Sequence, residues 1–201
     1  MSEVAAEKKA LRSLMQATLR SFASSELEIR GGEVARHIAA MEEWIGAHTI
    51  LCYLGMPKEL PTSQLIATAR RDGKAVAVPR IEGDEIDFLM LPLETTTLPR
   101  DRWNIPVPDP EWPPFDPKKA GKILVATPGI AFDLEGYRLG RGKGFYDRFL
   151  SRLRIEAPGF IALGLCLSEQ IVPQVPRDIY DQVMDGLVTD RGSTIFASGR
   201  N

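Results

Sequence analysis

The sequence predicts an α/β fold, a single three-layer domain in which helices flank a largely parallel central sheet. Two short apolar runs, TILCYLG at 49–55 and KILVATPG at 122–129, end in glycine and indicate strands buried on both faces. A strand, a helix and a strand follow one another within 49–80, as in a right-handed crossover unit. Because 201 residues suit one domain of ordinary size, we expect that domain to span residues 1–201.

The chain opens with two helical patterns. Between Lys8 and Phe22, apolar residues recur at helical spacing and basic residues occupy the other faces, which predicts an amphipathic helix. The glycine pair at 31–32 is expected to weaken or break the beginning of the second helix. The spacing that predicts this second helix is carried by Val34, Ile38, Met41 and Ile45.

The crossover unit begins with the strand at 49–55. Thr62 is a candidate N-cap for the following helix, and Gly73 is expected to end it. Its apolar face is formed by Leu65, Ile66 and Ala69. AVAVPR at 75–80 predicts the next strand of the sheet, and IDFLML at 86–91 is a candidate third strand.

A proline-rich segment separates the third strand from the strand at 122–129. Residues 106–117 contain six prolines, which exclude both a helix and a central strand. A domain linker is one interpretation, but the strands on both sides suit one sheet, so we expect an extended surface loop. Further along, the patterns predict a helix at 145–153 and strands at 159–167 and 185–190.

Composition excludes several classes of protein. With 25 basic and 27 acidic residues the net charge is −2, so a broad coat for nucleic acid is not expected. Cys52 and Cys166 lie in apolar runs, which favours buried, reduced thiols over a disulfide framework. No apolar signal region and no run long enough to span a membrane are visible, so we expect a cytoplasmic protein without membrane partners.

The segment at 127–150 carries the strongest chemical signal. It follows a predicted strand, leads into a predicted helix, and alternates glycines with Arg141 and Lys143. Alternating glycines let backbone N–H groups converge, and a helix N-terminus adds positive potential, so the segment predicts an anion site for phosphate. Asp147 then lies one helical turn in, where it is a candidate Mg²⁺ carboxylate.

Familiar phosphate motifs do not describe this segment. A Walker A loop would need glycine at 137 and serine or threonine at 144, but the chain has Tyr137 and Gly144. The dinucleotide fingerprint also fails, because the third glycine comes one residue early. A charged surface turn is the alternative, and the aromatic residues and the aspartate that follow the glycines favour the phosphate site.

The run GYRLGRGKGFYDRFL at 136–150, with PGIAFD before it and RWNIPVP at 102–108, resembles the 5-formyltetrahydrofolate cyclo-ligase family, also called 5,10-methenyltetrahydrofolate synthetase. The resemblance extends from KKALR near the start to VPRDIYDQVMDGLVTD near the end. It implies an enzyme that uses ATP and Mg²⁺ to close 5-formyltetrahydrofolate, with or without a polyglutamate tail, into 5,10-methenyltetrahydrofolate with release of ADP and phosphate.

The resemblance also implies roles for basic and glycine-loop residues. Arg141, Lys143 and Arg148 are implied to neutralise charge on the phosphoryl group during catalysis. Lys8 and Arg12 match a basic pair that contacts ATP in the family, although a basic pair on a helix is usually a solvated face. The implied ATP-binding residues are Lys8, Arg12, Arg138, Leu139, Gly140, Arg141, Gly142, Lys143, Gly144, Phe145 and Tyr146.

Metal and folate contacts are implied in the same way. Asp147 and Asp181 match the metal carboxylates of the family, and Asp185 competes with Asp181 for the second place. The implied folate-binding residues are Leu54, Glu59 and Trp103. Without the resemblance, Glu59 would be an ordinary surface charge and Trp103 a core residue. Departures from the family pattern are the glycines at 31–32, Pro61 and Phe145.

Two rival functions differ from the ligase in what they need. A non-catalytic nucleotide- or RNA-binding member of the same fold would bind ATP or RNA without turnover, and a sugar-phosphate isomerase would not use ATP. The near-neutral charge and the intact glycine segment favour the ligase, with no nucleic-acid partner. We expect a monomer, but the sequence leaves the oligomeric state and the preferred polyglutamate length open.

Overall fold

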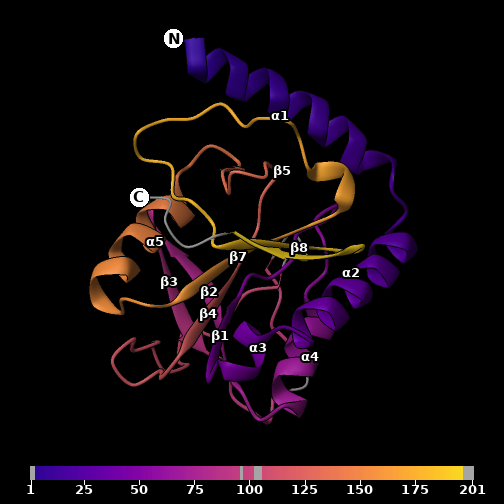
Figure 1. Cartoon of the computed structure of the whole chain (residues 1–201). Coiled ribbons are helices and arrows are strands. Elements are labelled where there is room, and N and C mark those ends of the chain that lie inside the picture. The colour runs from indigo at the N-terminus through magenta and orange to yellow at the C-terminus, as the bar shows by residue number, and fades with distance from the viewer. Residues whose placement is uncertain (1–2, 96, 102–105, 197–201) are drawn as a thin grey trace.

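A computed structural model describes residues 3–95, 97–101 and 106–196. Its centre is a seven-stranded sheet with the strand order β3-β2-β1-β4-β7-β8-β9 (Figure 1). The five inner strands are parallel, and the two edge strands are antiparallel to their neighbours, which confirms the predicted largely parallel sheet. The strands of this sheet are β1 (Thr49–Cys52), β2 (Ala75–Glu82), β3 (Glu85–Met90), β4 (Ile123–Thr127), β7 (Ile161–Cys166), β8 (Gly186–Thr189) and β9 (Gly192–Ile195).

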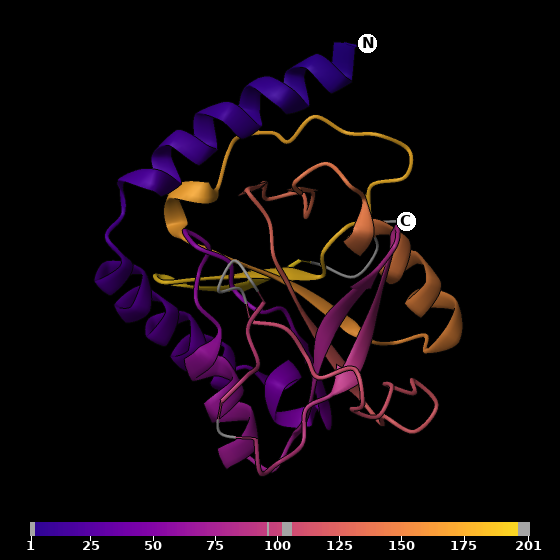
Figure 2. The same ribbon diagram turned by 180° about the vertical axis from the view of Figure 1, so that it is seen from behind.

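Helices cover both faces of the sheet. Successive side chains of a strand point to opposite faces, so the apolar residues of the inner strands pack against both helix layers. Ile50 and Cys52 of β1 belong to the apolar cluster under α2, α3 and α4, whereas Leu51 belongs to the cluster under α5. Figure 1 and Figure 2 show α1 lying across one end of this assembly. The helices are α1 (Glu3–Ser21), α2 (Ser24–Ala39), α3 (Glu42–Gly46), α4 (Ser63–Arg71) and α5 (Phe145–Glu156), with a 3₁₀ turn η1 (Ser168–Gln170).

The glycine pair at 31–32 does not break a helix, so that prediction is wrong. Helix α2 begins at Ser24 and runs through both glycines. A Cβ atom at Gly31 would lie 2.9 Å from the carbonyl oxygen of Pro61, and one at Gly32 would lie 2.5 Å from Oε1 of Gln64. The glycines therefore allow α2 to lie close against α4 and the loop before it. The residues of the predicted second helix instead belong to two helices, because α2 ends at Ala39 and α3 begins at Glu42.

Thr62 precedes α4, but its side chain does not cap the helix as predicted. The hydroxyl donates a hydrogen bond to the carbonyl oxygen of Tyr53 at 2.7 Å, so it links the end of β1 to the start of α4 instead. Gly73 follows the helix at a φ of +71°, as expected for a helix end.

The sequence patterns missed the smallest elements. Strands β5 (Ala131–Phe132) and β6 (Arg138–Leu139) form a separate two-stranded ribbon, and η1 and β9 were also unforeseen. The described residues of the proline-rich segment form no helix and no strand of the sheet, in line with the predicted loop. Within the described part of the chain, no helix is long and apolar enough to cross a membrane.

Candidate active site

A cavity of about 190 Å³ opens at the carboxyl ends of β1, β4 and β7. After β1 the chain adds β2 on one side and later β4 on the other, so the strand order reverses at β1. Ligands of open α/β sheets bind outside such a reversal point, at the carboxyl ends of the strands. The cavity is lined by side chains that follow these strands and by helix α1, among them Gln16, Leu19, Tyr53, Glu59, Pro128, Gly129, Ile130, Arg141 and Gln170.

The predicted anion loop lies beside this cavity. Its glycines connect β6 to α5, and Gly142 and Gly144 adopt φ values of +104° and +67°, which favour glycine. Gly144 is the N-cap of α5 and supplies no side-chain hydrogen bond to the first turn. The N–H groups of that turn consequently keep their affinity for an anion such as phosphate.

Helix α1 brings two basic side chains to the glycine loop. Arg12 Nε donates a hydrogen bond to the carbonyl oxygen of Gly140 at 2.8 Å, and Lys8 Nζ lies 2.5 Å from Oδ2 of Asp181. Lys8 and Arg12 therefore contact predicted site residues that are 173 and 128 positions away in the sequence. Lys143 lies on the loop itself, with Nζ 5.6 Å from the ring centroid of Phe145.

Arg141 reaches from the glycine loop to the cavity. Its Nε and Nη2 atoms both donate to Oε1 of Glu59, at 2.8 and 2.6 Å. The second oxygen of Glu59 accepts the backbone N–H of Met56 at 2.9 Å, which fixes the carboxylate on the loop after β1. This ion pair joins the predicted phosphate side of the site to the predicted folate side.

A second ion pair lies beneath the loop. Arg138 is 5% exposed and donates to Oδ1 of Asp147 at 3.0 Å, and the same oxygen accepts the backbone N–H of Gln182 at 3.1 Å. Asp147 therefore lies next to the segment that contains Asp181. Asp185 accepts the backbone N–H of Ala162 at 2.7 Å near the start of β7, so of the two competitors only Asp181 is paired with a predicted ATP contact, Lys8.

The two carboxylates fit a Mg²⁺ ion that is shared with phosphates. Among the described residues, the hydrogen bonds go to Oδ1 of Asp147 and to Oδ2 of Asp181, so each carboxylate keeps a second oxygen. No group of three or more metal-ligating side chains occurs within the described residues. Mg²⁺ needs no such group, because it binds through one or two carboxylates, phosphate oxygens and water.

The remaining predicted residues differ in their relation to the cavity. Leu54 is half-buried and is not part of the lining, while its neighbour Tyr53 is. Arg148 donates to the carbonyl oxygens of Lys143, at 2.9 Å, and of Asp84, so it braces the loop against the β2–β3 turn. Leu139 is buried behind the loop. Trp103 lies outside the described residues.

Two tyrosines lie near Glu59; Tyr53 is buried and Tyr146 is half-buried. Burial raises the pKa of both Tyr53 and Tyr146, and the Glu59 carboxylate adds to the rise, so both phenols stay neutral. Tyr53 donates its hydroxyl to the carbonyl oxygen of Leu60 at 3.0 Å. The hydroxyl of Tyr146 is buried and has no hydrogen-bond partner among the described residues.

The cysteines and histidines lie outside this chemistry. Both cysteines are buried and unpaired, as predicted, and burial raises the pKa of Cys52 to about 12. His48 Nδ1 accepts the backbone N–H of Lys122 at 3.1 Å, and His37 Nδ1 contacts the carbonyl oxygen of Thr189 at 2.9 Å. Neither histidine lines the cavity.

Residues 4–190 match the family model described as the 5-formyltetrahydrofolate cyclo-ligase family. A protein of Schizosaccharomyces pombe named "Probable 5-formyltetrahydrofolate cyclo-ligase" is 31% identical over 193 residues, which cover 91% of this chain and 95% of the relative. The 5-formyltetrahydrofolate cyclo-ligase of Mus musculus is 29% identical over 184 residues, covering 89% and 91%.

A solved structure agrees with these relatives. The NMR structure of 5,10-methenyltetrahydrofolate synthetase from Aquifex aeolicus superposes with a TM-score of 0.79 at 28% identity, covering 96% of this chain and 95% of that one. The fold of the central sheet and its flanking helices is thus shared with a solved protein.

Proposed function

The chain belongs to the 5-formyltetrahydrofolate cyclo-ligase family, and we propose that it closes 5-formyltetrahydrofolate into 5,10-methenyltetrahydrofolate while ATP is converted to ADP and phosphate. The observation that carries this proposal is the junction between the glycine loop and the cavity. There, Arg12 of the first helix contacts the glycine loop, and Arg141 of that loop pairs with Glu59 in the cavity wall.

ATP overcomes a chemical obstacle in this reaction. An N-formyl group is amide-like, so its carbon is a weak electrophile and its oxygen a poor leaving group. In the proposed mechanism the formyl oxygen attacks the γ-phosphorus, and ADP leaves. N10 of the folate then attacks the activated carbon, the bond from carbon to the phosphorylated oxygen breaks, and phosphate departs with that oxygen and with the proton lost from N10.

The glycine loop is proposed to hold the triphosphate. Its backbone N–H groups and the first turn of α5 would bind phosphate oxygens, with Lys8 and Arg12 approaching from α1. Arg141 and Lys143 would neutralise charge on the phosphoryl group as it moves, since little else is required of the protein in phosphoryl transfer. Arg148 supports this arrangement by holding the loop from outside.

Asp147 and Asp181 would hold Mg²⁺, which supplies positive charge to the phosphates when bound. The two carboxylates now neutralise Arg138 and Lys8, respectively. Those two basic groups can turn to phosphate when the carboxylates bind the ion. This exchange keeps charges of opposite sign paired throughout the site.

The cavity is proposed to receive the folate. Glu59 would accept hydrogen bonds from the N–H edge of the pterin, and the apolar residues of the wall would contact its ring. Leu54 and Trp103 remain predicted folate contacts. A cytoplasmic monomer that works as one domain, without a nucleic-acid partner, also remains a prediction.

One spectrophotometric experiment tests the proposed function. Folded protein mixed with 5-formyltetrahydrofolate, ATP and Mg²⁺ is expected to produce the absorbance of 5,10-methenyltetrahydrofolate, and the mixture without ATP is not. Binding of ATP without any growth of absorbance would favour a non-catalytic nucleotide-binding protein instead.

A further inference from the structure

Gln170 lies at the end of η1 and lines the cavity, although it is not one of the site residues predicted from the sequence. The side chain is buried, and its amide makes three hydrogen bonds. Nε2 donates to the carbonyl oxygens of Gly129 and Ile130 at 2.8 and 3.1 Å, and Oε1 accepts the backbone N–H of Leu167 at 2.8 Å. Both amide hydrogens and the amide oxygen are therefore used.

The two carbonyl groups that Gln170 binds belong to the cavity wall. Gly129 and Ile130 lie between β4 and β5; the backbone N–H of Ile130 donates to the carbonyl oxygen of Leu139 in β6 at 2.7 Å, whereas the carbonyl oxygens of both residues accept from Gln170. Because Gln170 binds both oxygens, neither is free to turn toward the cavity. Gly129 is also held from behind, since a Cβ atom there would lie 2.5 Å from Cζ of Phe132. Gln170 therefore fixes the two carbonyl groups of this wall, and the Leu139 contact fixes the N–H group of Ile130.

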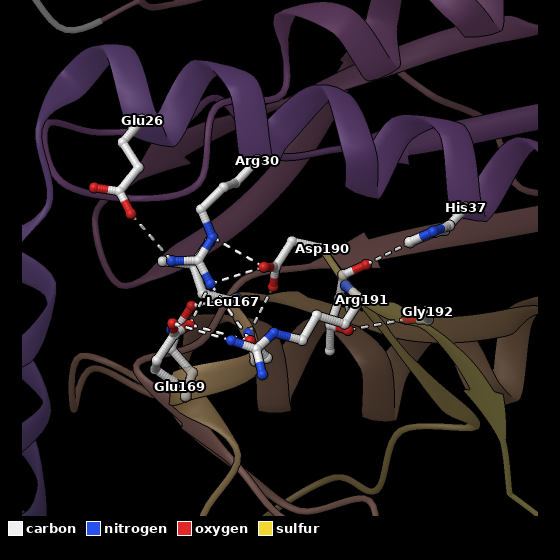
Figure 3. A network of polar contacts seen from close by, with 11 residues as sticks. Glu26, Arg30, His37, Leu167, Glu169, Asp190, Arg191 and Gly192 are labelled. Carbon is white, nitrogen blue, oxygen red and sulfur yellow. Dashed lines mark hydrogen bonds and ion pairs between the residues drawn. The ribbon is translucent and has the colours of Figure 1, made fainter.

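The turn that carries Gln170 is itself held by a network of charges around Arg30 of α2 (Figure 3). Arg30 forms ion pairs with Glu169, the residue before Gln170, and with Asp190, whose Oδ2 lies 2.8 Å from Nη2. Asp190 in turn accepts the backbone N–H of Ser168 at 2.8 Å through Oδ1. Two of the three residues of η1 are thus fixed from α2 and from the end of β8.

The network is built to stay ionised. The side chains of Arg30 and Asp190 are only 12% and 10% exposed. Partial burial acts to raise the pKa of Asp190, but the Ser168 N–H and Arg30 outweigh burial and hold the pKa below its ordinary value. Burial also acts to raise the pKa of Glu169, and Arg30 lowers it overall. At neutral pH both carboxylates therefore hold η1 as anions.

We propose that Gln170 is a positioning residue of the folate cavity and that the Arg30 network fixes it from behind. The inference rests on the proposed function for the identity of the ligand. Gln170 acts through the backbone of Gly129 and Ile130, whereas the triphosphate side of the site is held separately by α1 and the glycine loop. Disturbing Gln170 should therefore affect the two substrates unequally.

Gln170→Glu tests this division of labour, because it keeps the size of the side chain and removes both N–H donors. Two carbonyl oxygens then face a carboxylate, and the wall must move. At pH 8 we expect the KM for 5-formyltetrahydrofolate to rise about tenfold and the KM for ATP to change by less than about twofold. Gln64→Glu is the matched control, since it removes an amide that donates to the carbonyl oxygen of Glu28 outside the cavity and should change neither KM value.

The pH dependence of the folate KM distinguishes a positioning role of Gln170 from a general loss of structure. A buried carboxyl group has a raised pKa, and when protonated it regains one donor for the wall. Relative to the wild type at each pH, the defect of Gln170→Glu in folate KM should therefore shrink as the pH is lowered from 8 to 6. Equal increases in both KM values, or a lower melting temperature with an unchanged KM ratio, would overturn the proposal.

Arg30→Lys extends the test without touching the cavity. Lysine keeps the charge but has no planar group that can donate hydrogen bonds to Glu169 and Asp190 at once. The folate KM should rise by a smaller factor than in Gln170→Glu, while Arg36→Lys on the exposed face of α2 should change neither KM. An unchanged folate KM in Arg30→Lys would remove the network from the proposal.

Failure of the proposed function is recognised separately. If the wild-type chain gives no ATP-dependent absorbance, the function fails. The role of Gln170 is then read from the rise in melting temperature caused by 5-formyltetrahydrofolate alone. A smaller rise for Gln170→Glu than for Gln64→Glu would support the role in binding, and equal rises would refute it.

Discussion

Replacing Glu59 with glutamine should tighten the binding of ATP, although it removes a charged group from the site. In the ligand-free protein Arg141 is engaged with Glu59 at 2.6 Å, so it must leave this partner before it can contact a phosphate. Glutamine can still accept the N–H of Met56 but carries no charge to hold Arg141. ATP binding to the variant therefore no longer includes the cost of opening the ion pair.

The size of the effect follows from the exposure of the pair. The side chains of Arg141 and Glu59 are 49% and 19% exposed, so the pair is partly screened by water. Such pairs contribute about 0.5–1 kcal/mol. That range corresponds to a two- to fivefold lower Kd for ATP, at about 1.4 kcal/mol per factor of ten.

Isothermal titration with ATP and Mg²⁺, in the absence of folate, measures this difference. It should shrink as the ionic strength is raised, because salt screens exposed charges. Glu33→Gln is a suitable control, since Glu33 pairs with Arg36 on the exposed face of α2. An ATP affinity that is unchanged or weaker in Glu59→Gln would refute the reasoning.

Four further substitutions separate binding from stability. Lys143→Ala should weaken ATP binding much more than folate binding, as measured by titration with each, because it removes charge at the phosphates; equal losses would contradict this role. Asp147→Asn should increase the Mg²⁺ concentration for half-maximal rate and lower the free energy of unfolding by about 1–2 kcal/mol, since Arg138 loses its charged partner; an unchanged Mg²⁺ titration would exclude Asp147 from the metal site. In urea unfolding, Gly32→Ala should stabilise the chain by about 0.5–1 kcal/mol through helix propensity, because only the flexible end of a side chain must move. Gly31→Ala should instead destabilise it by about 1–2 kcal/mol, because its Cβ meets a backbone carbonyl, and a stabilised Gly31→Ala would show that the close approach has no cost.

The central sheet was predictable because its inner strands are buried on both faces. A short apolar run such as TILC carries that signal alone, independently of its neighbours in space. The ribbon of β5 and β6 has only two residues in each strand, too few for any pattern. The glycines at 31–32 were misjudged for a different reason, since only the approach of Pro61 and Gln64 explains why a helix contains them.

The two halves of the site also differed in how far the sequence could predict them. The glycine loop is contiguous in sequence, so its spacing and charge predicted an anion site without knowledge of the fold. The cavity is assembled from Tyr53, Gly129 and Gln170, which follow three different strands. Only the strand order brings them together. The rule that ligands bind beyond the carboxyl ends of parallel strands would have indicated the first residues after each predicted strand.

The contacts of α1 also constrain how the protein is made. Lys8 and Asp181 are 173 positions apart, and Arg12 and Gly140 are 128 apart. During synthesis the first helix therefore emerges long before either of its partners exists. A chain that stops before Asp181 could build most of the sheet yet leave this helix without its ion pair. This part of the proposed nucleotide site can therefore form only after the chain has been made at least as far as Asp181.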